Sequence, residues 1–298
     1  MTELTDMHTA PAPERSAVPR ESVLRGLLRR PRFVIAGSLV LLILVMAVFP
    51  MLFTDIDAHD TNRCDLGTAL ASPSESHWFG TDALGCDYYA QVIYGSRPSI
   101  VIGLAVTTCT FLISLVLGSL TGYLGGWVDS LVSRLCDVMF GLPFILGAIV
   151  VLQLFESRTV GTVCLALTLF YWPGGVRFMR SAVMKVRSLE YVQASRLLDA
   201  SGFYIVRKHV IPNAVTPLVV LKTLGLGGVI AAEAGLTFIG VGLDAPAVSW
   251  GLQLASAKSE VNAHPHLLAF PALFLSVTVF AFVLFGEAVR DGLDPKTR

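Results

Sequence analysis

Long runs of apolar residues alternate with short polar stretches along this chain of 298 residues. The first run, residues 33–53, carries no charge, and as a helix rising about 1.5 Å per residue it would cross a hydrocarbon core of about 30 Å. Five further runs of similar character follow, at residues 99–123, 131–155, 159–176, 213–243 and 267–286. The pattern predicts an all-α membrane protein with six transmembrane helices.

Small residues and breakers inside these runs are compatible with membrane helices and allow close helix contact. They are Gly118, Pro143, Gly225, Gly227 and Gly228. Only the short stretch "ESRT" separates the third run from the fourth. We therefore expect these two helices to form a tight hairpin.

Composition agrees with a membrane protein. Hydrophobic residues make up 54% of the chain and charged residues 15%, well below the about 25% of soluble domains. The mean hydropathy is +0.67, and the net charge of zero gives no reason to expect a nucleic acid partner. The opening stretch is polar and Pro-rich without an apolar core, so it is not a signal peptide. Residues 1–32 are expected to form a disordered cytoplasmic tail.

The distribution of Lys and Arg predicts the orientation, because basic residues concentrate on the cytoplasmic side. Of 22 such residues, 17 fall in the N-terminal tail, at residue 134, in residues 177–208 and in the C-terminal tail, against 4 on the other side. Both termini are therefore predicted to be cytoplasmic, including the tail of residues 292–298. The loops of residues 54–98 and 244–266 are predicted to face outside, in a multi-pass protein of the cytoplasmic (inner) membrane.

Motifs for catalysis are absent. The chain has no Gly-Lys pair, hence no P-loop, and neither H-E-x-x-H nor G-x-S-x-G. We predict that the chain is not an enzyme and holds no cofactor or metal. Glu260, His264 and His266 are interpreted as a polar outer loop. No inverted repeat relates the two halves, which disfavours a secondary transporter.

One charged segment stands out between apolar runs: "EYVQASRLLDASGFYIVRKHVIPNA", residues 190–214. As a helix over residues 190–201, it has a polar stripe of Glu190, Gln193 and Arg196. Its apolar stripe and small residues are Tyr191, Ala194, Ser195, Leu198, Ala200 and Ser201.

Gly202 suits a left-handed helix end, and a second stretch, residues 203–210, is expected to end before Pro212. This predicts a helix–turn–helix at the cytoplasmic surface. The alternative is an amphipathic helix resting on lipid headgroups, and periodicity alone does not decide between them.

The segment resembles the cytoplasmic "EAA" loop of ABC importer permeases, the element that contacts the separate ATPase subunit. The family pattern falls on Gln193, Ala194, Ser195, Asp199 and the "HVIPN" of residues 209–213. Further stretches are similar to the peptide/nickel branch: "HWFGTDALGCDYYAQVIYGSRPSI", "AEAGLTFIGVGL" and "GEAVRDGLDP". The likeness covers residues 33–298, and the segment order resembles the C-type permease of the pair.

Three positions depart from the family pattern. Gln193 replaces Glu, Ser195 replaces the second Ala, and Asp199 replaces Gly. Asp enters the left-handed region more readily than most residues, and we expect Gly202 to share the turn.

The resemblance implies a type I ABC importer permease architecture, with a core of residues 99–291 and a cytoplasmic coupling segment of residues 181–212. It implies transport of di- or oligopeptides by alternating access, coupled to an ATPase through residues 190–202. The coupling residues are Glu190, Gln193, Ala194, Ser195, Arg196, Asp199, Gly202, His209 and Pro212. The alternatives are a nickel or opine importer permease, a proton-coupled secondary transporter using Glu233, and a membrane-embedded enzyme.

The implied partners follow from the same resemblance. They are a homologous second permease, one or two ATP-binding subunits that hold ATP and Mg²⁺, an extracytoplasmic substrate-binding protein, the peptide and membrane lipid.

Two charges fall inside the fifth run, and we predict that they belong to the translocation path or its gate. Charges within a membrane are costly and face protein or water. Glu233 and Lys222 are 11 residues apart, about 16 Å along a helix, so they cannot pair. For Lys222 the alternative is snorkelling towards the cytoplasm. For Glu233 the match to "AEAGL" favours a structural or gating hydrogen bond.

The cysteines divide into two groups. Cys109, Cys136 and Cys164 lie in apolar runs and are interpreted as small apolar residues. Cys64 and Cys86 share the predicted external loop, where disulfides persist, and Cys86 stands where the family signature usually has Arg. They are a candidate disulfide; two free thiols are the alternative, because spacing does not give connectivity.

Overall fold

The computed structural model describes residue 28 and residues 30–293, and the elements in this part of the chain are helices. The long ones are α2 (Pro31–Val48), α3 (Tyr88–Leu124), α4 (Gly126–Gly141), α6 (Val160–Arg187), α9 (Ile211–Phe238) and α11 (His266–Leu293). The shorter ones are α5 (Phe144–Leu152), α7 (Glu190–Leu197), α8 (Gly202–Ile205), a π-turn (Val206–Val210) and α10 (Trp250–Ser256). Three single 3₁₀ turns precede α3, at Pro50–Leu52, Thr61–Arg63 and Leu66–Thr68.

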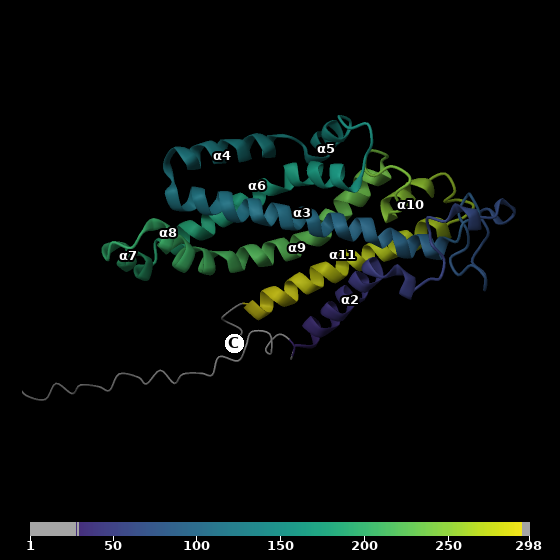
Figure 1. Cartoon of the computed structure of the whole chain (residues 1–298), viewed down its shortest axis with the longest axis horizontal. Helices are drawn as coiled ribbons and strands as arrows, with labels where there is room; N and C mark the ends of the chain where they lie inside the picture. Colours follow the sequence, from purple (N-terminus) through teal and green to yellow (C-terminus); the bar gives the residue numbers. More distant parts are fainter. Residues whose placement is uncertain (1–27, 29, 294–298) are drawn as a thin grey trace, which may run out of the picture.

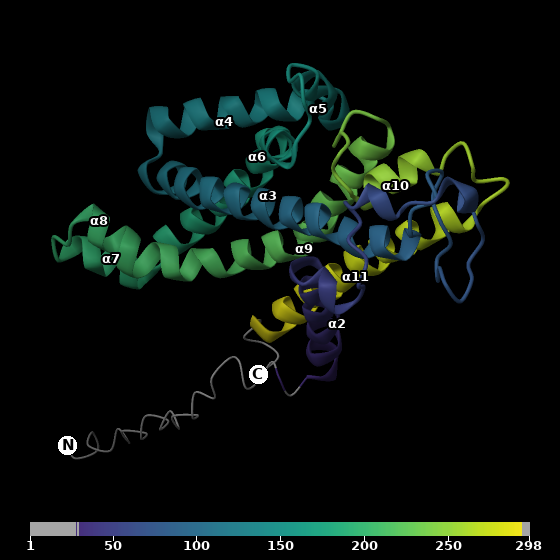
Figure 2. The same ribbon diagram turned by 45° about the vertical axis from the view of Figure 1, so that its right-hand side comes forward.

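The long helices form one elongated bundle (Figures 1 and 2). Helices α7 and α8 lie at one end, whereas α10 and the segment that precedes α3 lie at the other. Helix α4 runs beside α3 and α6 on one side of the bundle, and α2 packs with α11 on the other. We call the end that carries α7 and α8 the coupling end, after the segment predicted to couple; the opposite end is rich in loops.

All six predicted runs fall on helices, which confirms the all-α class. Within the described residues four helices are long and apolar enough to cross a membrane, or five if the bent pair α4–α5 forms one span. Helix α6 coincides with the predicted fourth span but is not among them, because the stretch "YWPGGVR" interrupts its apolar character. The count of six spans stays a prediction.

Two predicted boundaries were wrong near the start of the bundle. Helix α2 ends at Val48 rather than at Phe53, because Pro50 disfavours helical backbone at Phe49, whose φ is −123°. Helix α3 begins at Tyr88 rather than at residue 99, because the Asp87 carboxylate accepts from the Ala90 N–H at 2.8 Å and caps it. The outer segment predicted as residues 54–98 therefore ends at residue 87.

The expected single helix over residues 131–155 is also wrong, because α4 and α5 meet at an angle of 91°. The break falls at Leu142 and Pro143, where the ring of Pro143 cannot continue the helical hydrogen bonding of α4. The polypeptide then returns through residues 153–159 to α6, so the hairpin is formed by α5 and α6.

Helices α3 and α6 share the most extensive contact in the bundle. Gly118 and Gly122 on α3 are four residues apart and face α6. A Cβ at Gly118 would lie 2.6 Å from the Cβ of Met179, and one at Gly122 would lie 2.8 Å from the Cβ of Val183. Small residues at this spacing let two membrane helices approach closely, so α3 and α6 are held together at the coupling end.

Candidate functional site

The predicted coupling segment, residues 181–212, starts within the last turns of α6, and its coupling residues begin with α7 after Ser188 and Leu189. Helix α7 ends at Leu197, and Asp199 takes the left-handed conformation with a φ of 53°. The predicted helix to residue 201 with Gly202 at its left-handed end is therefore wrong. Gly202 is the first residue of α8, capped by Ser201. The turn is made at the position where the resembled family has Gly.

The second half of the segment does not stop before Pro212 as expected. It passes through the π-turn Val206–Val210 and continues as α9, with Pro212 in the first turn of that helix. The wider turn accommodates a proline that has no N–H to donate and whose ring crowds the preceding turn. The Asn213 side chain donates to the His209 carbonyl at 2.6 Å. The coupling segment is thus continuous with the transmembrane helices α6 and α9.

A buried valine anchors α7 to the bundle. Val192 is fully buried in a cluster that joins α3, α6, α8 and α9. The cluster contains Met179, Val183, Val186, Val192, Ile205, Val210, Ala214 and Leu218. Val192 belongs to neither the polar nor the apolar stripe predicted for this helix. The signal for its burial is Leu189, an apolar residue three positions earlier and therefore on the same helix face.

The polar stripe of α7 is exposed at Glu190 and Gln193 and half-buried at Arg196, and two of its side chains contact the bundle. The Gln193 side chain donates to the Arg187 carbonyl at 3.0 Å, and the Arg196 guanidinium lies 5.2 Å from the Tyr123 ring of α3. The Ser195 hydroxyl donates to the Tyr191 carbonyl at 2.9 Å within α7. Gln193 and Arg196 therefore attach α7 to α6 and α3, while Ser195 bonds within its own helix.

The outward face is apolar. Leu197, Leu198 and Phe203 have exposed fractions of 87%, 83% and 75%. Glu190, Ala194 and Asp199 are also exposed. The segment is attached to the bundle through its buried side, and its tip exposes two leucines and a phenylalanine. An exposed apolar patch of this kind is typical of a surface that contacts another protein. His209 and Pro212 lie behind this tip, where the His209 ring contacts those of Tyr191 and Tyr204.

Glu233 is a completely buried carboxyl group on α9. The hydroxyls of Ser99 on α3 and Thr237 on α9 each donate to one of its oxygens at 3.0 Å. The Leu243 N–H donates to the Thr237 hydroxyl at 3.1 Å. Glu233 therefore connects α3 to the turn that follows α9.

Lys222 lies elsewhere on α9 and does not contact Glu233. Its side chain reaches Gly175 of α6, where a Cβ would stand 2.9 Å from both Cε and Nζ and would also collide with Ser114 of α3. Among the described residues its ammonium has no hydrogen bond or ion pair. The absence of a side chain at Gly175 is what makes room for it.

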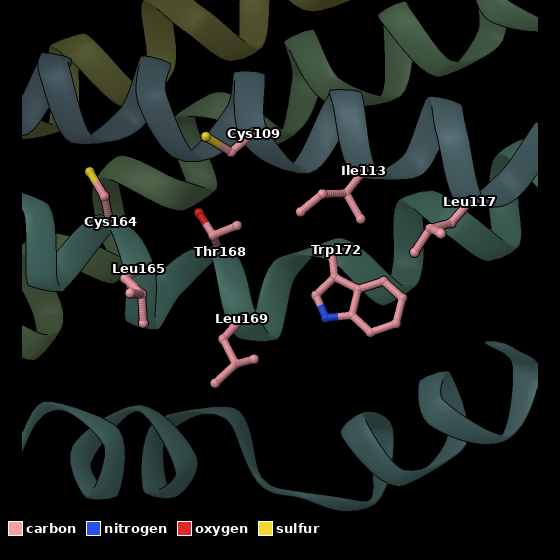
Figure 3. Close-up of a pocket in the computed structure, with 8 residues that line it drawn as sticks. All are labelled: Cys109, Ile113, Leu117, Cys164, Leu165, Thr168, Leu169 and Trp172. Carbon is pink, nitrogen blue, oxygen red and sulfur yellow. The ribbon is translucent and has the colours of Figure 1, made fainter. Parts of the chain in front are cut away.

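An apolar groove of about 430 Å³ lies between α3 and α6 (Figure 3). Cys109, Ile113 and Leu117 line it from successive turns of α3, and Cys164 and Trp172 are among the α6 residues opposite. Two of the cysteines interpreted as small apolar residues thus face this groove, while Cys136 is buried. Neither Glu233 nor Lys222 lines the groove.

The segment before α3 is built around a bond between Cys64 and Cys86. Close packing surrounds this bond, because a Cβ at Gly85 would collide with the Asp65 carbonyl. The Asp82 carboxylate accepts from the Cys86 N–H at 2.8 Å and from the Gln91 side chain at 2.6 Å. The segment is therefore folded and attached to the first turn of α3.

The fold is that of a type I ABC importer permease. It is similar to a solved structure of the MetNI methionine ABC transporter in an inward-facing conformation, with a TM-score of 0.57 and 18% identity over 68% of this chain and 97% of that chain. A solved amino acid ABC transporter with histidines gives a TM-score of 0.53 and 15% identity over 67% and 92%.

The family follows from the sequence. Residues 114–298 match the model of the binding-protein-dependent transport system inner membrane component, and the chain belongs to this family. It is 37% identical to the dipeptide transport system permease protein DppC of Bacillus subtilis (strain 168), over 91% of this chain and 84% of the relative. It is 34% identical to the glutathione transport system permease protein GsiD of Pectobacterium atrosepticum, over 94% and 92%. The resemblance to ABC permeases is confirmed.

Proposed function

We propose that this chain is one transmembrane subunit of an ATP-driven importer for di- or oligopeptides, and that residues 190–202 contact a separate ATPase. The proposal rests on one observation: the coupling segment presents an apolar tip on a chain that has no nucleotide motif of its own. Burying a large apolar side chain contributes about 1.5–3 kcal/mol. Leu197, Leu198 and Phe203 together therefore offer enough apolar surface for a stable contact.

The geometry supports a direct mechanical link. Because α7 follows α6 after two residues and the π-turn leads into α9, displacement of the tip moves both helices. Closure of the ATPases on ATP and Mg²⁺ would pull on the tip, and the helices would then reorient around the path between this chain and a second, homologous permease. This chain carries out no hydrolysis.

Peptides are the substrate class that the relatives favour. The relatives named above, together with the oligopeptide permease OppC of Bacillus subtilis (35% identical), transport dipeptides, oligopeptides or glutathione by their names. Nickel and opines are therefore less well supported cargoes. An extracytoplasmic binding protein would deliver the peptide to the end that carries the Cys64–Cys86 segment.

The proposed orientation places both termini and the coupling tip in the cytoplasm. The 17 basic residues on that side, against 4 on the other, support it. The same orientation puts Cys64 and Cys86 in the oxidising compartment.

Glu233 and Lys222 remain candidates for the path or its gate. For Glu233 we favour a gating hydrogen bond over proton transfer, because hydroxyls already engage both carboxylate oxygens. A proton-coupled transporter is distinguished by measuring peptide uptake into proteoliposomes of the complete importer. Uptake should need ATP and persist when an uncoupler collapses the proton gradient, and the reverse would refute the proposal.

The coupling contact is tested by overpacking its small residues. Ala194→Trp and Ser195→Trp should lower ATP-dependent uptake about tenfold or more, because overpacking a fitted surface costs about 1–3 kcal/mol. Leu154→Trp is the control, since Leu154 is 78% exposed and lies outside the segment. Normal uptake by both segment variants would reject the contact.

A further inference from the structure

Tyr123 lies one residue before the end of α3, where three parts of the coupling region converge on it. The Arg196 guanidinium of α7 lies 5.2 Å from the ring centroid, and the Arg187 guanidinium, at the end of α6, lies 5.9 Å away. The first residue of α8, Gly202, approaches the Tyr123 hydroxyl, which would be 3.5 Å from a Cβ at that position. One aromatic side chain thus contacts α6, α7 and α8.

Two different forces hold the guanidinium groups. Both lie within the distance at which an aromatic face attracts a cation, and Arg favours this arrangement. Arg187 also donates to the Tyr123 carbonyl at 2.9 Å, one of the last carbonyls of α3, which have no partner within the helix. For Arg196 the contact with α3 that the structure describes is the ring. The Tyr123 ring therefore links the polar side of α7 to α3, beside the apolar cluster that contains Val192.

The surroundings of Tyr123 offer little other contact between α8 and α3. A hollow of about 270 Å³ lies between them, and it is lined by Ser119, Leu120, Tyr123, Leu124, Gly202, Phe203 and Val206. Incomplete packing leaves space for relative movement, since a void removes contacts from its lining. Here Tyr123 offers a direct route by which a displacement of α7 and α8 reaches α3, beside the route through α6 and its close contact with α3.

The other end of α3 is hydrogen-bonded to α9 and α11. Ser99 bonds Glu233 of α9, and the Tyr88 hydroxyl donates to the Leu267 carbonyl of α11 at 2.6 Å. Beyond Tyr123 the chain turns through Gly125 and Gly126, whose φ values of 69° and 60° are left-handed. This turn reverses the chain between the end of α3 and the start of α4. A shift of α3 would therefore be passed to α9 and α11.

We propose that Tyr123 is the positioning residue that transfers movement of the coupling segment to α3. Arg196 takes part through the cation–aromatic contact of its guanidinium with the Tyr123 ring. This rests on the proposed function as an ATP-driven importer. In this proposal Arg196 contacts α3 of its own chain and does not contact the ATPase directly. The Tyr123 hydroxyl makes no hydrogen bond within the described chain, so the ring is the active part.

The test uses the complete importer with its partner subunits, in proteoliposomes. Tyr123→Leu removes the ring, Tyr123→Phe keeps it, and Arg196→Gln removes the cation from an exposed helix without disturbing the core. The readouts are the amount of ATPase that co-purifies, the rate of ATP hydrolysis, and the number of peptides transported per ATP.

We expect Tyr123→Leu and Arg196→Gln to keep the ATPase bound and hydrolysing while transport per ATP falls about fivefold, the size of one cation–aromatic contact. Tyr123→Phe should restore the wild-type ratio. The double variant Tyr123→Leu/Arg196→Gln should be no worse than the poorer single variant, because both changes remove the same contact.

Four results would overturn the proposal. They are a normal ratio in Tyr123→Leu, equal impairment by Tyr123→Phe, loss of bound ATPase, or multiplying effects in the double variant. If the wild-type importer transports without ATP, the proposed function fails together with this inference. ATP-dependent wild-type transport combined with a normal Tyr123→Leu rejects the role of Tyr123 alone.

Discussion

At the scale of single residues, Asp199 makes the left-handed turn of the coupling segment, and Val192 is buried where α7 attaches to the bundle. The sequence offered Gly202 and Asp199 as residues able to make the left-handed turn, and the backbone uses Asp199. Propensity could not decide, because both residues tolerate that conformation. The burial of Val192 depends on side chains of α6 and α9 packing around it. The residue pattern of one short helix does not predict such tertiary contacts.

The charge at Glu233 gives a prediction at the same scale. Glu233→Ala removes the acceptor to which the Ser99 and Thr237 hydroxyls donate, at a cost of about 1–3 kcal/mol for each buried donor left unsatisfied. Glu233→Gln keeps one oxygen that can accept from a hydroxyl, and its NH₂ group can donate to the Ser99 hydroxyl oxygen. We expect the alanine variant to lose most uptake and the glutamine variant to retain most of it, measured as initial uptake rates at equal amounts of membrane-inserted protein.

The matched control is Glu287→Gln, an exposed carboxylate on α11. Complete and equal loss of uptake in both Glu233 variants, with a normal control, would instead indicate that Glu233 must titrate.

At the scale of elements, apolar length predicted where helices exist, while prolines and caps decided where they end. Pro50 ends α2 before its predicted end, Asp87 starts α3 before its predicted start, and Pro143 produces the bend between α4 and α5. The sequence could not show the bend, because membrane helices accommodate many prolines without breaking. Pro98 and Pro173 indeed lie inside α3 and α6.

The contact between α3 and α6 gives the prediction for this scale. Gly118→Ala should lower stability by about 1–3 kcal/mol, because its new methyl would meet the Met179 Cβ and the Val176 carbonyl in a packed interface. Gly174→Ala on α6 is the control, since in the part of the chain that the structure describes a Cβ there would meet no atom of another element within 4 Å. Thermal unfolding in detergent, followed by tryptophan fluorescence, measures the difference, and equal melting temperatures for the two variants would contradict it.

At the scale of the whole molecule, the sequence predicted a bundle with one cytoplasmic element and a loop-rich outer end, because the apolar runs and basic residues set that plan. It could not place the groove between α3 and α6 or the attachment of α10. These depend on how helices far apart in sequence meet, as when the Trp250 indole N–H donates to the Val92 carbonyl at 2.9 Å.

The Cys64–Cys86 bond makes the prediction at this scale. Peptides containing the two cysteines should be recovered as one linked species by mass spectrometry without reduction. The Cys64→Ser/Cys86→Ser variant should expose the segment to protease, because the closed loop, with its sequence separation of 22, contributes about 3 kcal/mol. Cys109→Ser, at an exposed thiol on α3, should change nothing. Alkylation of both thiols in unreduced protein would reject the bond.

The length of α3 has a mechanical consequence. Its 37 residues extend about 55 Å, well beyond a hydrocarbon core of about 30 Å. Its close contact with α6 at Gly118 and Gly122 lies near the end that faces α7 and α8. A rod supported near one end is a lever with a short and a long arm, so a small tilt of that end becomes a larger sweep, in the opposite direction, of the end that Trp250 contacts.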